Sequence, residues 1–159
     1  PHYIENRVPN REWKGETGMR FMILRLADKD TEAGIMPSQE LLAAMGKYME
    51  ELAAAGVLLG GEGLQPTSKG ARVKFSRGRP TVTHGPFSDG KMIAGYAMIQ
   101  VNSKDEAIEV LKRWPILDAN GEVELELRQV FEAEDFGAEF TPELREKEER
   151  MRAELGKRN

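Results

Sequence analysis

The chain has 159 residues, a formal net charge of −4 and no cysteine. This length suits one domain with appendages better than two ordinary domains, and a composition of 40% hydrophobic and 31% charged residues is typical of a globular protein. The absence of cysteine excludes disulfides, thiolate chemistry and Cys-ligated zinc.

Membranes and nucleic acids are poorly supported as partners. No apolar run approaches the roughly 20 residues of a membrane-spanning helix. The negative charge, without a cluster of Lys and Arg interleaved with aromatic residues, argues against direct binding to nucleic acid. No segment has the pattern of a signal peptide, so we expect a cytoplasmic protein.

The first half of the chain predicts an extension, a strand and a helix. Residues 1–18 are polar and have no hydrophobic period, which indicates either a native arm or an artefact of expression or of the start site. The apolar run from Met19 to Ala27, interrupted by Arg25, is typical of a central strand buried on both faces. The pair Pro37-Ser38 opens a helix that ends at Gly56. Its apolar residues recur at intervals of three and four: Leu41, Leu42, Met45, Met49 and Leu52.

Four further strands form the middle of the chain. A short strand is expected at residues 57–61. Residues 71–76 alternate with period two and residues 81–83 return antiparallel to them, which predicts a small hairpin with one solvated face. The next strand covers residues 93–101.

The last third of the chain predicts helix, strand, helix. Ser103 and Glu106 have the spacing of a capping box that starts a helix, and Pro115 ends it. Residues 123–128 alternate between apolar and charged, as in a strand with one buried face. Thr141 caps a terminal helix with only a thin apolar stripe, which is either a solvated tail or a clasp on a second subunit.

Without the hairpin, this order is that of the ferredoxin-like βαββαβ fold, an α+β architecture. Right-handed crossovers place both helices on one face of the antiparallel sheet. The opposite face is expected to carry Phe21, Ile23, Arg25, Tyr96, Met98, Gln100, Glu124, Glu126, Arg128 and Val130. Because so much apolar surface would be an exposed patch on a monomer, we expect a homodimer packed sheet to sheet, with the charged members lining a pocket or its rim.

The segment from Thr81 to Lys91 contains several residues with special backbone conformations. Gly85 and Gly90 permit positive φ and Pro86 lacks a backbone donor, so this segment is expected to be a shaped loop between two strands. It contains His84; the only other histidine is His2, so one subunit offers no multi-histidine metal site, and no metal is predicted. His84 is either a hydrogen-bonded structural histidine or a group that binds ligand or transfers protons.

The same residues carry a resemblance to a known family. The segment from Thr81 to Lys91, followed by Ile93-Ala94-Gly95-Tyr96 and by Ser103-Lys104-Asp105-Glu106-Ala107, resembles the YCII-related family in its DGPF-domain branch. The branch is typified by Asp-Gly-Pro-Phe, an acidic residue, a Lys, a Gly-aromatic strand start, a helix containing Glu-Ala and a final Glu-x-Arg strand. The resemblance extends from Met19 to about Phe131.

The resemblance implies a dimeric α+β barrel, here with an inserted β-hairpin and a C-terminal helix. We therefore expect an extension at residues 1–18, the YCII/DGPF-like domain at 19–131, and an acidic linker with the terminal helix at 132–159. Relatives in the wider superfamily include lyases, isomerases and monooxygenases, DGPF domains are also associated with sigma factors, and the YCII group is suspected of acid–base catalysis through a His and an Asp. In this chain His84 stands where the motif begins with Asp, so either His84 acts as the base or the activity is altered or lost.

Two function classes follow. In the first, the dimer is an enzyme that performs acid–base chemistry, of the lyase or isomerase type, on a small organic and anionic molecule without a cofactor. His84 and Asp89 are then catalytic, with His84 as general base or acid and Asp89 or Glu126 as its partner. The residues expected to bind substrate are Arg128, Glu126, Tyr96, Arg25, Lys91 and Phe87. In the second, the dimer is a ligand-binding or regulatory module without catalysis, associated with transcription through sigma-factor systems.

Overall fold

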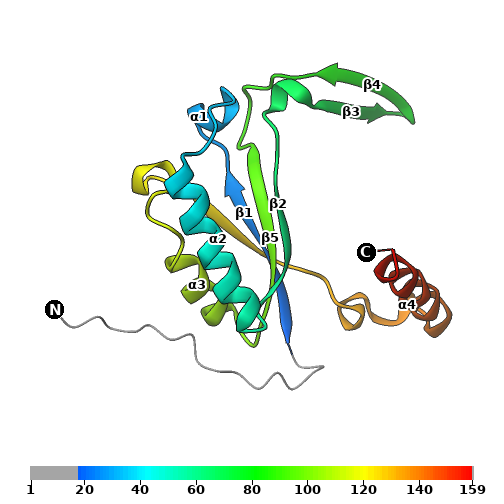
Figure 1. Cartoon of the computed structure of the whole chain (residues 1–159). Coiled ribbons are helices and arrows are strands. Elements are labelled where there is room, and N and C mark those ends of the chain that lie inside the picture. Colours follow the sequence, from blue (N-terminus) through cyan, green and yellow to red (C-terminus); the bar gives the residue numbers. More distant parts are fainter. Residues whose placement is uncertain (1–17, 159) are drawn as a thin grey trace. The chain divides into compact units, whose positions relative to one another are not determined.

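The computed structural model describes residues 18–158. Its helices and strands are, in chain order, β1 (Met19–Leu26), α1 (Lys29–Glu32), α2 (Gln39–Ala54), β2 (Leu58–Gly63), β3 (Ala71–Ser76), β4 (Arg79–His84), β5 (Ile93–Val101), α3 (Lys104–Lys112), β6 (Leu125–Gln129) and α4 (Pro142–Gly156) (Figure 1). Short 3₁₀ turns follow β2, α3 and β6. The chain divides into two compact units, one ending at Gln129 and the other beginning at Val130.

Four strands of the first unit form one sheet in the order β2-β5-β1-β6, with every neighbouring pair antiparallel. The helices α2 and α3 lie side by side on one face of this sheet (Figure 1). This strand order and the helices on one face confirm the predicted α+β fold of the ferredoxin-like type. None of the helices within residues 18–158 has the length and apolar character needed to cross a bilayer.

Local sequence signals explain the start of both helices that cover the sheet. The Ser38 hydroxyl accepts a hydrogen bond from the Leu41 amide at 3.1 Å and so caps α2, as predicted. In α3, Ser103 accepts from the Glu106 amide at 3.2 Å, while the Glu106 carboxylate accepts from the Asn102 amide at 2.9 Å. The buried core lies between these helices and the sheet and consists of Phe21, Ile23, Tyr48, Leu52, Val57, Ala97, Ile99, Val101, Ala107 and Val110.

The predicted orientation of β1 is wrong. Phe21 and Ile23 were expected on the face away from the helices, but they are 2% and 0% exposed and belong to the core beneath α2 and α3. Arg25 follows the same parity and also lies on the helix-covered side, where it pairs with Asp118. The apolar residues of β1, which are interrupted only by Arg20 and Arg25, show no alternation that would distinguish its two faces.

The predicted hairpin is confirmed as a separate two-stranded sheet of β3 and β4. All twelve strand residues are exposed, so neither of its faces is buried in the described chain. Its turn uses left-handed backbone at Arg77 (φ 50°) and Gly78 (φ 76°).

The second unit contains a 3₁₀ segment and the terminal helix. Phe136 packs against Phe131 and Phe140 with ring centroids 5.0 and 5.5 Å apart. The helix α4 begins as predicted, with the Thr141 hydroxyl accepting from the Leu144 amide at 3.3 Å and Pro142 in the first turn. None of its residues is buried within the described chain.

Candidate functional site

The sheet face opposite α2 and α3, here called the distal face, carries two regular rows of side chains. Strand register places Glu126, Leu24, Tyr96 and Glu62 in one row across β6, β1, β5 and β2. The adjacent row consists of Arg128, Met22, Met98 and Gly60. The four apolar or aromatic side chains that β1 and β5 contribute to these rows are half-buried. The distal face therefore combines an apolar centre with charged groups at its margins.

Lys91 joins the loop after the hairpin to one end of this face. Its ammonium donates to a Glu124 carboxylate oxygen at 2.7 Å. This hydrogen bond, together with the charges of Glu124 and, more weakly, Glu126, raises the pKa of Lys91. Backbone bonds fix the arrangement, because the amides of Leu26 and Ala27 donate to the carbonyls of Glu124 and Met92 at 3.1 and 2.8 Å.

Arg128 and Glu126 occupy the same face of β6, two residues apart. One Arg128 Nη lies 3.5 Å from a Glu126 oxygen, and their side chains are 70% and 44% exposed. The two side chains therefore form a surface ion pair in which the guanidinium makes a single long contact. Most of the planar donor set of Arg128 is therefore available to a carboxylate or phosphate.

The loop that follows His84 is held at its start by a short series of hydrogen bonds. The Phe87 amide donates to the Thr67 hydroxyl oxygen at 3.0 Å, and that hydroxyl donates to a Glu32 oxygen at 2.6 Å. The Thr67 amide donates to the other Glu32 oxygen at 3.2 Å. The Gly85 amide donates to the Gly70 carbonyl at 3.0 Å, and the Gly85–Pro86 peptide bond is cis. These contacts fix the backbone on both sides of the loop.

Asp89 is paired with Arg72, not with the nearby histidine. The Arg72 guanidinium donates to Asp89 at 2.7 Å and also lies 3.9 Å from the centroid of the Phe87 ring. The hydrogen bond from Arg72 lowers the pKa of the Asp89 carboxyl. His84 ends β4 opposite Ala71 and is exposed. Within residues 18–158 its imidazole takes part in no hydrogen bond or ion pair, so the predicted pair of His84 with Asp89 is not formed in this chain.

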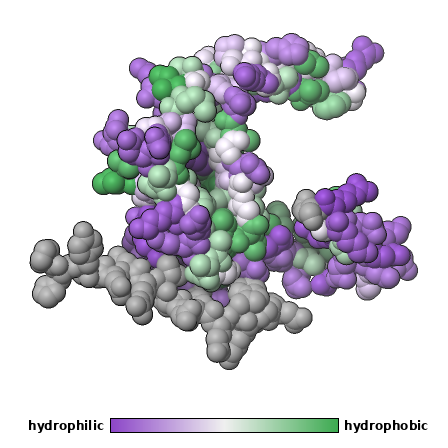
Figure 2. Space-filling view, in the orientation of Figure 1, coloured by the Kyte–Doolittle hydropathy of each residue, from purple (hydrophilic) through white to green (hydrophobic). Residues whose placement is uncertain are grey.

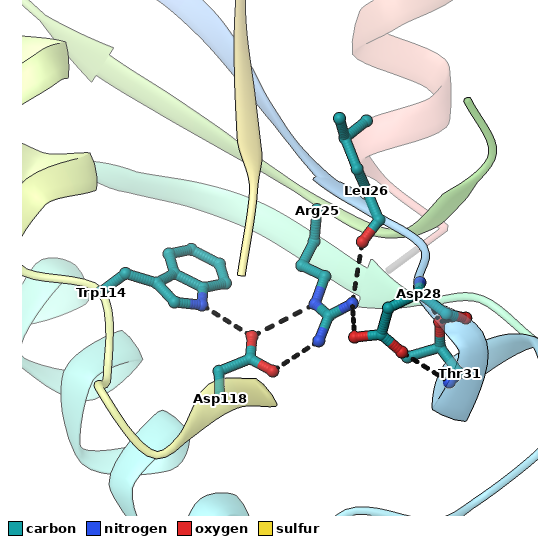
Figure 3. Close-up of polar contacts among 6 residues, drawn as sticks. All are labelled: Arg25, Leu26, Asp28, Thr31, Trp114 and Asp118. Carbon is teal, nitrogen blue, oxygen red and sulfur yellow. Dashed lines mark hydrogen bonds and ion pairs between the residues drawn. The ribbon is translucent and has the colours of Figure 1, made fainter. Parts of the chain in front are cut away.

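Arg25 lies in a different environment, a polar network on the helix-covered side (Figure 3). Its guanidinium donates to both Asp118 oxygens at 2.6 and 3.2 Å, to Asp28 at 3.1 Å and to the Leu26 carbonyl at 2.8 Å. The Trp114 indole donates to Asp118 at 2.9 Å. All of these groups are satisfied within the protein, so the arrangement is that of a structural centre. Arg25 does not face Tyr96, Glu126 and Arg128, with which it was expected to line a cleft.

The predicted site residues thus fall into three places. Lys91, Tyr96, Glu126 and Arg128 share the distal face. His84 ends the hairpin, and Phe87 and Asp89 belong to the loop that follows it. Arg25 lies on the helix-covered side of the sheet. Sequence reasoning missed Glu124 as the partner of Lys91, although its alternation with Glu126 already assigned it to that face. It also missed Thr67 and Glu32, for which no local pattern gives a signal.

No metal site emerges from the described part of the chain. In residues 18–158, no three His, Asp or Glu side chains are grouped so that they would hold a metal ion. The polar groups on the distal face are instead a mixture of two cations and several carboxylates, which suits recognition of a polar organic molecule.

Comparison with known families agrees with this fold. A family model described as YCII-related domain matches residues 19–133, which include the whole sheet, both long helices that cover it and the hairpin. No curated protein matches the chain. Because the match extends over most of the chain, the protein belongs to the YCII-related domain family.

Proposed function

We propose that the protein is a cytoplasmic homodimer that binds a small organic anion where two distal faces meet. The observation that carries this proposal is the row of half-buried apolar side chains at the centre of the distal face, flanked by Lys91, Glu126 and Arg128. An exposed apolar strip of this kind is typical of a surface that binds another protein and is thereby removed from water. Packing two such faces together would remove the strip from water and leave the charged margins around a cleft.

In this cleft Arg128 orients the anionic group of the ligand. Its guanidinium has one long contact with Glu126 and is 70% exposed, so a carboxylate or phosphate can take two parallel hydrogen bonds from it. Tyr96 supplies an aromatic surface and a hydroxyl, and Glu126 accepts a hydrogen bond from an O–H or N–H of the ligand. Lys91 remains paired with Glu124 and adds positive charge to the margin.

Binding without chemical conversion is the role that the geometry favours. A general base needs an orienting partner and access to its substrate, and Asp89, one of the two partners considered for His84, is held by Arg72. We assign this chain to the DGPF branch as a ligand-binding or regulatory module, in keeping with the sigma-factor association of that branch.

Acid–base catalysis is the second candidate, and one observation favours it. The His84 imidazole is exposed and unpaired within residues 18–158, while the backbone beside it is fixed by Thr67 and Gly70. A neutral imidazole in this position is free to take a proton from a bound molecule. The substrate would be of the same small anionic class, and lyase or isomerase chemistry would require no cofactor.

A ligand screen by thermal unfolding tests the binding proposal. Succinate, benzoate and inorganic phosphate serve as first probes, because a ligand that binds only the folded state raises the Tm. Arg128→Gln should abolish the shift without lowering the Tm of the free protein. Arg113→Gln, the same change on the helix-covered side, should leave the shift intact. Equal shifts in both variants would refute the role of Arg128.

The same samples separate binding from catalysis. Mass spectrometry of the ligand after incubation should recover it unchanged if the protein is a binding module. A product that forms with the wild type and not with His84→Asn would establish the catalytic candidate instead. For the dimer, sedimentation velocity should show that Met98→Asp, which places a charge at the centre of the distal face, is monomeric at concentrations where the wild type is dimeric.

A further inference from the structure

The hairpin of β3 and β4, here called the arm (residues 71–84), has two chemically different faces. Cross-strand pairs put Ala71, Val73, Phe75, Pro80, Val82 and His84 on one face. Arg72, Lys74, Ser76, Arg79, Thr81 and Thr83 make up the other. Figure 2 shows that the arm carries both hydrophobic and hydrophilic residues. Val73, Phe75 and Val82 are 55%, 66% and 55% exposed, so the apolar face has no cover in the described chain.

The arm is also the positive part of an acidic protein. Residues 64–88 contain Lys69, Arg72, Lys74, Arg77 and Arg79 and no Asp or Glu, so this segment carries +5. Since the whole chain carries −4, the remainder carries −9. Arg72 is paired with Asp89, but the other four cations have no ion pair within residues 18–158. Such separation of charge favours contact with an acidic surface.

The base of the arm is anchored although its strands are not. Gly85 lies so close to the Thr67 backbone that an added Cβ would come within 1.7 Å of the Thr67 carbonyl oxygen. Hydrogen bonds from Gly85 to Gly70 and from Phe87 to Thr67 hold the same junction. A two-stranded hairpin alone is marginally stable in water. A hairpin that is anchored at its base and exposed on both faces is therefore suited to bind a partner that covers one of these faces.

We infer that the arm docks through its apolar face on a second copy of this chain and so clasps the dimer. This inference rests on the dimer of the proposed function and names a second contact within it. The partner copy meets both requirements of the arm, because its charge outside residues 64–88 is −9 and it exposes apolar residues beside acidic ones. Residues 30–42 are one such segment, in which Ile35, Met36 and Leu42 are 60%, 81% and 58% exposed in the company of Asp30 and Glu40.

The apolar face decides between a protein and a nucleic acid as the partner. A two-stranded ribbon fits the DNA major groove, and its cations would contact phosphates. Half of the side chains of this hairpin, however, lie on the face that contains Val73, Phe75 and Val82. Binding to a polyanion would leave this apolar face exposed to water. An acidic protein surface with apolar residues satisfies both faces, since long Arg and Lys side chains reach past the edges of the ribbon.

Sedimentation velocity of two matched variants tests the clasp. Phe75→Asp places a carboxylate on the apolar face, and Thr83→Asp places the same group on the opposite face of the same ribbon. We expect Phe75→Asp to raise the dimer Kd by at least about tenfold and Thr83→Asp to change it little. Raising the NaCl concentration from about 50 mM to about 500 mM should weaken the wild-type dimer, because exposed charges are screened.

A cross-linking experiment identifies the partner directly. Because the chain has no cysteine, Val82→Cys gives a single thiol on the apolar face that can carry a benzophenone maleimide, and Thr83→Cys is its control on the other face. After illumination of a mixture of ¹⁴N- and ¹⁵N-labelled protein, Val82→Cys should yield cross-linked peptides that join the two isotopes. Cross-links confined to one isotope would overturn the inference, as would a labelled DNA duplex that binds equally well to wild type and Phe75→Asp.

The outcomes separate this inference from the proposed function. If Met98→Asp is monomeric while Phe75→Asp associates like the wild type, the distal-face dimer stands and the clasp fails. If Phe75→Asp dissociates while Met98→Asp remains dimeric, the clasp stands and the pairing of distal faces fails. A wild type that is monomeric at all concentrations refutes both.

Discussion

Arg25 and Asp118, 93 residues apart in the chain, are joined by two hydrogen bonds of 2.6 and 3.2 Å between the guanidinium and the carboxylate. Their side chains are 12% and 7% exposed. Trp114 donates to the same carboxylate, and Asp28 accepts from the same guanidinium. The pair therefore ties the end of β1 to the turn after α3, and every polar atom in it has a partner, as a buried ion pair requires.

Removing the Asp118 carboxylate should destabilise the protein strongly. Asp118→Ala leaves the Arg25 guanidinium with only Asp28 as a charged partner and the Trp114 indole without an acceptor, so we expect the free energy of unfolding to fall by about 3 kcal/mol. Urea denaturation followed by circular dichroism measures this loss. Asp89→Ala, which breaks an exposed ion pair, should leave the urea midpoint at the wild-type value. Equal midpoints for wild type and Asp118→Ala would contradict a structural role for the network.

Asp28 should contribute to the loss of stability in acid. Desolvation acts to raise the pKa of its carboxyl, but the hydrogen bond from the Thr31 amide and the nearby Arg25 outweigh it, and the pKa is lowered. Because the folded pKa lies below the unfolded value of about 3.9, the stabilisation is present above that pH and is lost as pH falls through the folded value. Urea unfolding between about pH 2 and pH 7 should therefore show a shallower acid decline for Asp28→Asn than for wild type. Asp30→Asn, an exposed neighbour in α1, is the control and should retain the full decline.

Tyr48 should make the fold sensitive to alkali. Its hydroxyl donates to the Val110 carbonyl in the core, and desolvation raises its pKa to about 12. The neutral phenol is favoured in the folded state, so its contribution is present below the unfolded pKa of about 10 and disappears as pH rises through about 12. Tyr48→Phe should be less stable than wild type by about 1 kcal/mol at neutral pH and should lose less stability above about pH 10. A parallel decline of both proteins would show that Tyr48 is not the titrating group.

The strands with clear alternation could be oriented from the sequence. In β5, Ala97 and Ile99 alternate with Tyr96 and Met98, and the structure buries the first pair and leaves the second half-buried. The caps at Ser38, Ser103 and Thr141 were equally readable, because each depends on a local hydrogen bond within three residues. Local chemistry thus specifies most elements and their order.

The face of β1 could not be read in this way. Arg25 was assigned to the distal face together with Phe21 and Ile23, because the three residues occupy alternate positions along the strand. The partner is Asp118, which lies 93 residues away, so no local pattern shows it. The helix α1 gives no signal in the hydrophobic pattern either, because its four residues carry no hydrophobic period and it depends on the cap formed between Asp28 and Thr31.

In the candidate site, too, the local pattern could be read from the sequence and the long-range contacts could not. Glu126 and Arg128 were placed together because they alternate on one strand. The separation of Asp89 from His84 was not foreseeable, because it depends on Arg72 reaching across from β3 to the loop. Long-range pairing of charged side chains is a property of the folded chain, and the spacing within a motif does not encode it.

The junction beneath the arm provides a last test. A Cβ at Gly85 would lie 1.7 Å from the Thr67 carbonyl oxygen and 2.6 Å from its carbon, both backbone atoms that cannot move aside easily. Gly85→Ala must therefore displace the loop and weaken the hydrogen bond from the Phe87 amide to Thr67, at a cost of about 1–3 kcal/mol. Hydrogen exchange should then become faster at Phe87 and at the arm, while amides of β1 and β5 keep their protection. Gly60→Ala is the matched control, because its Cβ would meet nothing within 4 Å, and it should leave exchange at Phe87 unchanged. Wild-type exchange at Phe87 in Gly85→Ala would mean that the loop is not held against Thr67, and the anchored arm would then lose its basis.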